Sequence, residues 1–395
     1  MSRTIKSTTG LSRQFLNLIM SNHAPGIKSL RRIDLGRIFN PTTPGPPPNR
    51  DRSESAAGQQ DFVFRPPEFK MDIIRLPTLT FSFRASASAS SASDEWKMDC
   101  FPLSDGKVMC VDQSGRGFLF DANSREVATV PYLCKSKVMP ISLSIPQADV
   151  DQDYRNYDWG SKLFLMERMP KLEVNCSTQQ SDQFEAFIYR KRIEHMGLKS
   201  WHHHLLPPPP FVHETFNCDS RPEITSYAVI DGGSHICISV EGAGTYCMHT
   251  VSHTWNRVGE WTLPFHGKIE YVPELKLWFG ISTDSGHLAA ADLSAMDSQP
   301  QLVGTWKELD PPAGWKECKD SQFVSLGSGR FCIARFFQTK TVDVHFGDEL
   351  LKENFTVITG VEVVNGDSSN NAKVELQMIP HKLSRVNSTT IEALF

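Results

Sequence analysis

Two cysteines and two histidines in the middle of the chain have the residue types and the spacing of a metal site. His235, Cys237, Cys247 and His249 fall within one short segment that is interrupted by the sequence EGAG. Thiolate sulfur and imidazole nitrogen are ligands that zinc takes in proteins, and two of each complete a set of four. These residues are therefore the candidate metal ligands of the chain.

The segment that carries them is typical of a β-hairpin. Ile236 and Ile238 alternate with smaller residues, and Tyr246 and Met248 do the same beyond the two glycines. Matching these apolar faces across the hairpin requires a three-residue turn at 241–243. The two cysteines then lie opposite each other, as do the two histidines, all on one face. Because a flat face holds four ligands in a plane rather than in a tetrahedron, we interpret them as residues of a packed strand and expect no metal and no other cofactor.

Two further patterns resemble metal sites less closely. The three consecutive histidines at 202–204 cannot all face one ion, because neighbouring residues of a strand point to opposite sides, so we expect them at the surface. The acidic run at 149–153 resembles the start of a calcium-binding loop, but Tyr154 stands where that loop requires glycine and Gly160 stands where it requires glutamate. We expect a solvated loop there.

The sequence contains no motif that identifies an enzyme. A nucleophile elbow, a phosphate-binding loop, an HExxH helix and a dinucleotide fingerprint are all missing from the chain. We therefore expect a protein without catalytic activity. A site assembled from scattered residues in three dimensions stays open as an alternative.

The elements that surround these residues predict a repeating β architecture. Residues 227–265 read as strand, glycine turn, strand, polar turn and strand, and weaker copies begin near residues 96, 270 and 323. The starts at 227, 270 and 323 are 43 and 53 residues apart, close to the ~40–50 residues of propeller blades. An apolar strand end, a polar turn and a returning Trp or Val are arranged as in kelch repeats. We predict an all-β fold, an irregular kelch-like β-propeller of about five to seven blades.

The N-terminal part differs in composition from the rest. Residues 1–40 carry seven Lys or Arg and one acidic residue, and residues 41–60 are rich in Pro, Gly and Ser. We predict a largely flexible basic segment and linker over 1–60, whose apolar residues at 30–39 dock on a propeller domain at 61–395. A low-complexity loop is expected at 84–94. Because acid-poor, Arg-rich N-termini also direct import, a mitochondrial or plastid transit peptide is the alternative for the first forty residues.

Charge and cysteine content limit the partners. The net charge is −4, which does not favour a nucleic-acid surface, and no apolar run is long enough to span a membrane. The nine cysteines form no C-x-x-C pair, and no secretory leader is visible. We expect reduced thiols and a cytoplasmic or nuclear protein.

Several segments resemble a known family. The sequences LRRIDLGRIF at 30–39, FEAFIYR at 184–190, YVPELKLWFGIS at 271–282 and TGVEVV at 359–364 are similar to those of a plant family that is expanded in grasses. Its members have no known function and have an F-box-associated, kelch-like propeller character. The resemblance implies a propeller that retains residues 30–39, and it brings no catalytic residues. An F-box helix is not visible in residues 1–60.

These observations favour a non-enzymatic protein–protein interaction module. We expect a monomer that binds an unidentified protein partner through its loops and the mouth of its central channel. The alternatives are a propeller-based enzyme or carbohydrate-binding protein, and a protein imported into an organelle.

Overall fold

The computed structural model describes residues 13–22, 24–39, 71–76, 79–85, 96–146, 161–173, 180–191, 199–214, 221–342, 350–366, 376–386 and 391–395. Nearly all of the regular structure in these ranges is β-strand, with one short helix, α1 (Gly36–Phe39), and short 3-10 turns. None of the described helices is long and apolar enough to cross a membrane. The predicted all-β class is therefore confirmed.

Most strands occur in groups of four that follow one another along the chain. Each group is an antiparallel sheet in chain order, which we call a unit. Unit II contains β5 (Met98–Pro102), β6 (Lys107–Asp112), β7 (Gly117–Asp121) and β8 (Val127–Thr129). Unit III contains β9 (Pro140–Ile145), β10 (Lys162–Glu167), β11 (Ser181–Lys191) and β12 (Lys199–Leu206). Unit IV contains β13 (Ile224–Ile230), β14 (His235–Val240), β15 (Gly244–His249) and β16 (Trp255–Gly259).

Units V and VI complete the series, and unit VI has the longest strands. Unit V contains β17 (Phe265–Val272), β18 (Leu277–Ser282), β19 (Leu288–Ala291) and β20 (Leu302–Trp306). It is joined to unit IV by parallel pairing of their first strands, β13 and β17, which gives one eight-stranded sheet. Unit VI contains β21 (Lys316–Gly327), β22 (Arg330–Val342), β23 (Leu350–Asn365) and β24 (Leu376–Val386), with β3 (Asp72–Ile73) as a fifth, parallel edge strand.

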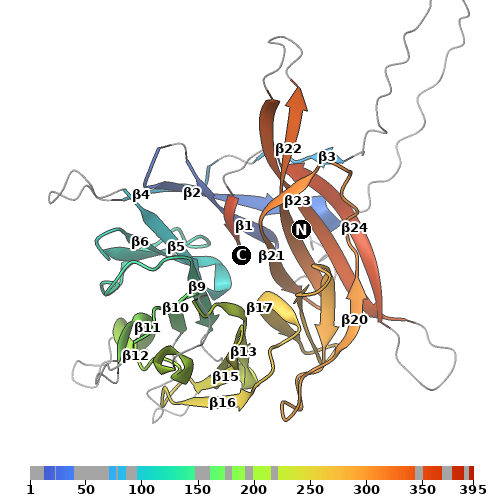
Figure 1. Cartoon of the computed structure of the whole chain (residues 1–395). Helices are drawn as coiled ribbons and strands as arrows, with labels where there is room; N and C mark the ends of the chain where they lie inside the picture. The colour runs from blue at the N-terminus through green and yellow to red at the C-terminus, as the bar shows by residue number, and fades with distance from the viewer. Residues whose placement is uncertain are drawn as a thin grey trace, which may run out of the picture.

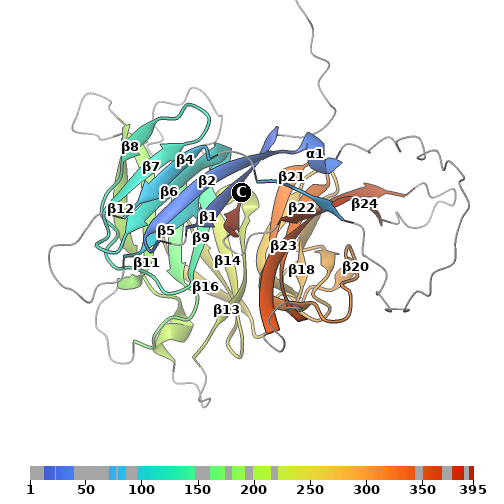
Figure 2. The same ribbon diagram turned by 90° about the horizontal axis from the view of Figure 1, so that it is seen from above.

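The two ends of the chain build unit I together. The order of this sheet is β25 (Ile391–Leu394), β1 (Phe15–Ser21), β2 (Ile27–Asp34) and β4 (Phe81–Arg84). The first described strand therefore pairs with the last one, with Leu18 opposite Leu394. In Figure 1 the six units follow one another around a common centre, and the blue strands meet the red end of the chain at β1. Figure 2 shows the C-terminus between the blue strands and the sheet of β21–β24.

The apolar core is divided among the junctions of neighbouring units. Phe83 and Phe120 belong to the cluster between units I and II, and Phe184 and Tyr246 to the cluster between units III and IV. Similar clusters join II to III, IV to V, V to VI and, through β1 and β21, VI to I. Each sheet has apolar side chains on both faces and buries them against two neighbours, which explains strands such as β10 that are buried along their whole length.

The N-terminal segment corrects the predicted domain boundary. Residues 15–39 are not a flexible entry that docks on a finished domain, because β1 and β2 are the middle strands of unit I. The apolar residues expected to dock, among them Leu30 and Ile38, are fully buried. The basic composition suggested a flexible segment, but it is compatible with a strand. The arginines of β2 occupy its less buried positions, while its backbone pairs with that of β1. A transit peptide cut after residue 40 would remove both strands. Residues 41–60 and most of 84–94 lie outside the described residues.

Candidate functional site

The first strands of neighbouring units begin on one face of the molecule, which we call the entry face. Contacts between residues at or near the starts of these strands show that the starts lie close together. Lys97, before β5, donates from Nζ to the backbone oxygen of Lys137, before β9, at 2.9 Å. Lys319, near the start of β21, donates from Nζ to the backbone oxygen of Ile391, which begins β25, at 3.1 Å. Loops that link consecutive units therefore collect on this face.

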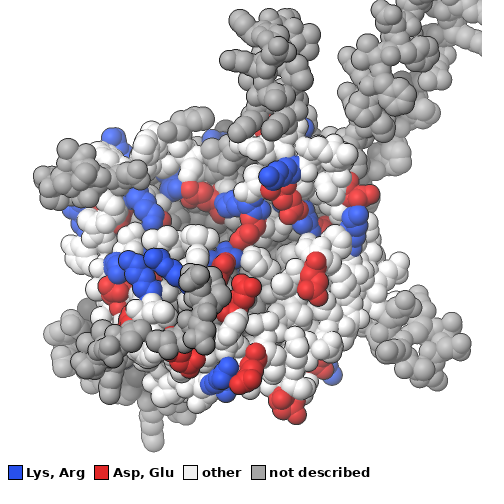
Figure 3. All heavy atoms as spheres, viewed as in Figure 1, with Lys and Arg blue, Asp and Glu red and all other residues white. Residues whose placement is uncertain are grey.

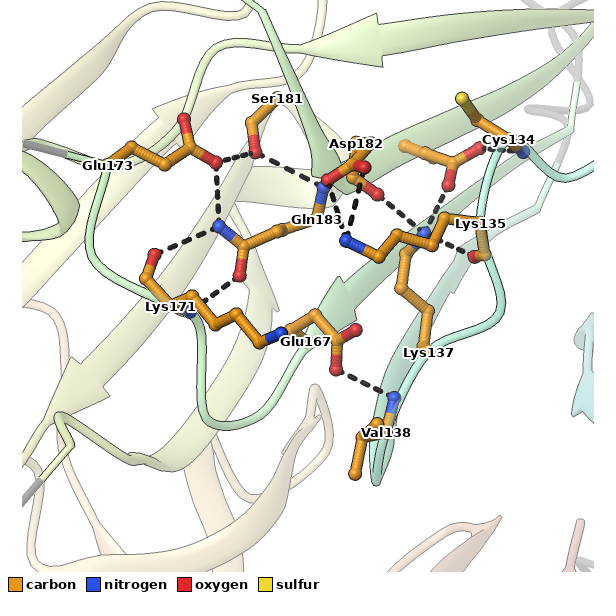
Figure 4. Close-up of polar contacts among 11 residues, drawn as sticks. Cys134, Lys135, Lys137, Val138, Glu167, Lys171, Glu173, Ser181, Asp182 and Gln183 are labelled. Atoms are coloured by element: carbon orange, nitrogen blue, oxygen red, sulfur yellow. Dashed lines mark hydrogen bonds and ion pairs between the residues drawn. The ribbon is translucent and has the colours of Figure 1, made fainter. Parts of the chain in front are cut away.

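A buried ion pair fastens one of these loops, residues 130–139, to unit III. The side chains of Lys137 and Glu185 are both 0% exposed and form an ion pair. The Lys137 amine also donates to the backbone oxygens of Lys135 and Asp182, each at 2.8 Å. It thus has three acceptors for its three hydrogens. Figure 4 shows this amine between Lys135 of the loop and Asp182 of β11.

The Glu185 carboxylate is satisfied as fully as the amine. One oxygen accepts the backbone N–H of Cys134 at 2.9 Å and lies 2.6 Å from Nε2 of His203 in β12. Burial alone would raise the pKa of Glu185, but the hydrogen bonds from His203, Lys137 and the Cys134 amide hold it below its ordinary value. The carboxylate therefore stays ionised near neutral pH and holds the loop through the backbone N–H of Cys134 and the side chain of Lys137.

The same loop has a second attachment, and the neighbouring loop of unit III is attached in a similar way. The backbone N–H of Val138 donates to the Glu167 carboxylate at 2.8 Å. Burial raises the pKa of that carboxyl, and the Val138 N–H opposes the rise. In the loop after β10, the amide side chain of Gln183 bonds both backbone groups of Lys171, at 2.6 and 3.0 Å, as well as Glu173 (Figure 4). Both loops are thus tied down by buried or half-buried side chains of β10 and β11.

Apolar side chains project into solvent from these two fastened loops. Val138 is 71% and Met139 53% exposed, and Met169 and Leu172 are exposed as well. Pro140 pairs with Glu167, so the two loops leave the sheet side by side. We call Val138, Met139, Met169 and Leu172 the apolar rim.

Beside the apolar rim, Arg168 joins four units. Its guanidinium forms ion pairs with Glu223 at 2.9 Å and with Asp320 at 2.8 Å, and it lies 2.9 Å from Nε2 of His266. These partners precede or belong to the first strands of units IV, VI and V. Burial raises the pKa of Asp320, but hydrogen bonds from Arg168 and His266 outweigh it, so the pKa is lowered and the carboxylate stays charged. The entry face is therefore held together by charge pairs as well as by apolar packing.

A cavity of about 390 Å³ lies between units V and VI on the same face. His266, Asp320 and Arg335 are among its lining residues. Arg335 is held by Glu308 at 2.5 Å and by Glu317 at 2.9 Å, and their charges raise its pKa against the effect of burial. Asp320 and Arg335 at this cavity are thus already paired with oppositely charged groups, and the Lys319 amine donates to backbone oxygens.

The predicted metal candidates come together in the predicted register. His235 lies opposite His249 and Cys237 opposite Cys247, around the three-residue turn. The two imidazole rings are 5.1 Å apart between centroids, and His235 contacts the Asp231 carboxylate at 3.0 Å. Across the described ranges, no three His, Cys, Asp or Glu side chains are grouped so that they could hold a metal ion.

The outcomes differ for the two weaker metal patterns, the acidic run and the three consecutive histidines. The run at 149–153 lies outside the described residues. Of the three histidines, His203 is not a surface residue as expected, because it bonds the buried Glu185 and its side chain is only 21% exposed. Sequence reasoning missed the Lys137–Glu185 pair, since its members are far apart in the chain. The available signal was a carboxylate in the otherwise apolar strand FEAFI.

The visible face of the molecule mixes both signs of charge. In Figure 3 blue and red side chains are interspersed, without one field of a single sign. Such a surface does not select a polyanion by charge alone.

Comparison with known proteins identifies a family but no function. A family model described as "Protein of unknown function (DUF1668)" matches residues 13–386. No curated protein matches the chain. Among solved structures, the β-propeller domain of Cps50 (Swd1) from Myceliophteria thermophila is 11% identical with a TM-score of 0.28, covering 67% of this chain and 92% of that one. The dihydro-heme d1 dehydrogenase NirN is 8% identical with a TM-score of 0.31, covering 95% and 75%. At these scores neither likeness carries an argument.

Proposed function

The chain belongs to the DUF1668 family of proteins of unknown function, and we propose that it is a non-enzymatic protein-interaction module built on a six-bladed, kelch-like β-propeller. In this proposal each four-stranded unit is one blade. Three arrangements support it: the terminal strands β1 and β25 share a sheet, β13 and β17 pair in parallel, and apolar clusters join each unit to the next. Closing a ring with the chain ends leaves a rigid body whose loops are free to bind.

The partner-binding surface in this proposal is the apolar rim. The observation that carries it is that Val138 and Met139 are exposed on a loop whose backbone is bonded to two buried carboxylates. Burying one such side chain contributes roughly 1.5–3 kcal/mol. A loop that is already ordered loses little conformational entropy on binding, so more of this gain remains as affinity. Unbranched methionines also adapt to the shape of a partner.

The proposed partner is a protein with an apolar patch of its own, and we place the encounter in the cytoplasm or nucleus. Interfaces of this kind depend on a few central side chains that are surrounded by polar ones. Lys135 and Asp182 form an exposed ion pair close to the rim and suit that outer position.

Affinity purification from the source tissue tests the proposal when variants are compared side by side. The bait carries Val138→Asp together with Met139→Asp, and the matched control carries Val127→Asp together with Val251→Asp. The control residues are 57% and 56% exposed, Val127 at the start of β8 and Val251 in the turn after β15, away from the entry face. A partner that the wild type and the control retain, and that the rim variant loses by at least about tenfold, supports the proposal, since two desolvated charges cost more than the ~1.4 kcal/mol of one decade.

Two outcomes contradict the proposal. One is that the rim variant retains every partner that the wild type retains. The other is that the control variant loses the same partners to the same extent. Circular dichroism of all three proteins verifies that each is folded.

A further inference from the structure

Four of the seven free cysteines in the described ranges stand in opposed pairs. Cys100 in β5 lies directly opposite Cys110 in β6, and Cys237 in β14 lies directly opposite Cys247 in β15. The Sγ atoms of the first pair are 3.5 Å apart. Neither pair is needed for the interaction surface proposed above.

Both pairs occupy non-hydrogen-bonded positions of an antiparallel ladder, where the Cα atoms of opposed residues are closest. Leu103 donates its N–H to the oxygen of Lys107 at 2.8 Å in the first hairpin, and Thr250 donates to Ser234 at 2.8 Å in the second. Because hydrogen-bonded and non-hydrogen-bonded pairs alternate, both cysteine pairs are non-hydrogen-bonded, with Cα atoms about 4.5 Å apart. Disulfides require about 4.4–6.8 Å. A bond can therefore form without separating the strands.

Within each pair, one thiol is reachable and the other is not. Cys100 and Cys247 are half-buried, whereas Cys110 and Cys237 are buried. Burial raises the pKa of Cys110, and the hydrogen bond with Cys247, followed by burial, raises that of Cys237. The half-buried member is therefore the one that a reagent reaches first, and the buried member resolves the product.

We propose that Cys100–Cys110 and Cys237–Cys247 are two dithiol modification sites, each of which forms a cross-strand disulfide on reaction with glutathione disulfide. The thiolate of the half-buried cysteine attacks one sulfur of glutathione disulfide and releases one glutathione thiolate, which leaves a mixed disulfide on the protein. The buried thiol gives up its proton and attacks the protein sulfur of that mixed disulfide, which releases the second glutathione. The protein loses two electrons and two protons per pair, and one glutathione disulfide becomes two glutathione molecules.

The two sites lie in the units that flank the apolar rim. Unit II and unit IV pack against opposite sides of unit III through their apolar clusters. Oxidation therefore crosslinks the first hairpin of unit II and the central hairpin of unit IV, on either side of the unit that carries the rim.

Peptide mass spectrometry of the full-length chain tests the proposal. Reduced protein is incubated with excess glutathione disulfide, unfolded, labelled with N-ethylmaleimide and digested with trypsin. Trypsin cuts after Lys107, so the first disulfide links two peptides, whereas no Lys or Arg lies between residues 237 and 247. The second disulfide is therefore read as one peptide that lacks two hydrogen atoms and both labels. We expect both signatures, with full labelling of Cys332, a buried cysteine that has no cysteine opposite it.

Single variants separate paired chemistry from general reactivity. In Cys100→Ser the thiol of Cys110 should regain full labelling, and in Cys247→Ser that of Cys237 should do so. The proposal is overturned if Cys110 and Cys237 stay fully labelled in the wild type, if glutathione remains on Cys100 and Cys247 while their partners are labelled, or if Cys110 still loses its label in the Cys100→Ser variant.

Discussion

Two polar clusters in adjacent units, one around Lys137 in unit III and one around His235 in unit IV, have opposite origins. The cluster around His235 comes from a single hairpin, and every contact among its four candidate ligands crosses neighbouring strands. The cluster around Lys137 combines a loop with β11 and β12, and its ion pair is inaccessible to solvent. The local cluster has the residue types and spacing of a metal site in the sequence. In the structure, the buried and fully bonded charged groups belong to the dispersed cluster.

The difference lies in what each cluster does for the backbone around it. His249 accepts the backbone N–H of Ser252 at Nδ1 at 3.1 Å in the turn after β15, but the shape of the β14–β15 hairpin is already set by its ladder and by a glycine turn. Lys137 and Glu185 fix a loop that has no ladder of its own, because they bond the backbone at Cys134, Lys135 and Asp182. Because removing one member of a buried charge pair leaves an uncompensated charge, we expect the conformation of this loop to depend on both residues.

The largest expected effect comes from breaking the buried pair. Glu185→Gln leaves the Lys137 amine buried without its counter-charge, so we expect the free energy of unfolding to fall by about 3–5 kcal/mol. The matched control is Asp182→Asn, which removes the exposed partner of Lys135 and should cost about 0–1 kcal/mol. Chemical denaturation measures both. Equal losses in the two variants would contradict the assignment.

Replacing both members of the pair sharpens the same comparison. Lys137→Met combined with Glu185→Leu removes both charges and keeps the volume, so most of the stability lost in Glu185→Gln should return. The loop loses its backbone bonds in this variant, and binding to a rim partner should fall although the fold is stable. A double variant that binds as well as the wild type would refute a positioning role for the pair.

Removing the guanidinium that links four units should have a smaller effect. Arg168→Met leaves Glu223 and Asp320 without their shared partner at the edge of the entry face, where both are accessible to water. We expect a loss of about 1–3 kcal/mol in the free energy of unfolding. A loss as large as that of Glu185→Gln would place the critical charge pair at Arg168 instead.

The loss of unfolding free energy at acid pH should be caused by protonation of the carboxylates whose pKa is lowered in the folded state. The folded-state pKa of Glu185 lies below its ordinary value, so the stability it contributes is fully present above about pH 4.5 and is lost as the pH falls through the folded value. The slope of unfolding free energy against pH should therefore be shallower in Glu185→Gln than in the wild type over that range. Parallel slopes would show that this carboxyl is not held in its charged form.

The smallest effect is expected at the hairpin of unit IV. His249→Ala should change the unfolding free energy by less than about 1 kcal/mol, because the half-buried side chain at the end of β15 bonds only the exposed turn that follows. Addition of a chelator should leave the thermal midpoint unchanged. A midpoint that drops with chelator and recovers with zinc would restore the hairpin as a metal site.

The sequence predicted the parts of the fold that depend on local patterns. Alternation and glycine spacing were sufficient for the unit IV hairpin, down to its three-residue turn and the pairing of Cys237 with Cys247. The place of β1 could not be predicted in this way, because its partner β25 lies at the other end of the chain and no local pattern records that pairing. The Lys137 cluster was missed for the same reason, since its carboxylate comes from a strand 48 residues away.

Amide hydrogen exchange at residue level tests the central claim, that the apolar rim stands on a loop fastened from beneath. The N–H groups of Cys134 and Val138 donate to the buried carboxylates of Glu185 and Glu167. We predict slow exchange at both positions in the wild type. In the Lys137→Met, Glu185→Leu double variant, which has no acceptor for the Cys134 N–H, we predict exchange of the Cys134 amide at the rate of an open loop. Exchange at the open-loop rate at both positions in the folded wild-type protein would contradict the account.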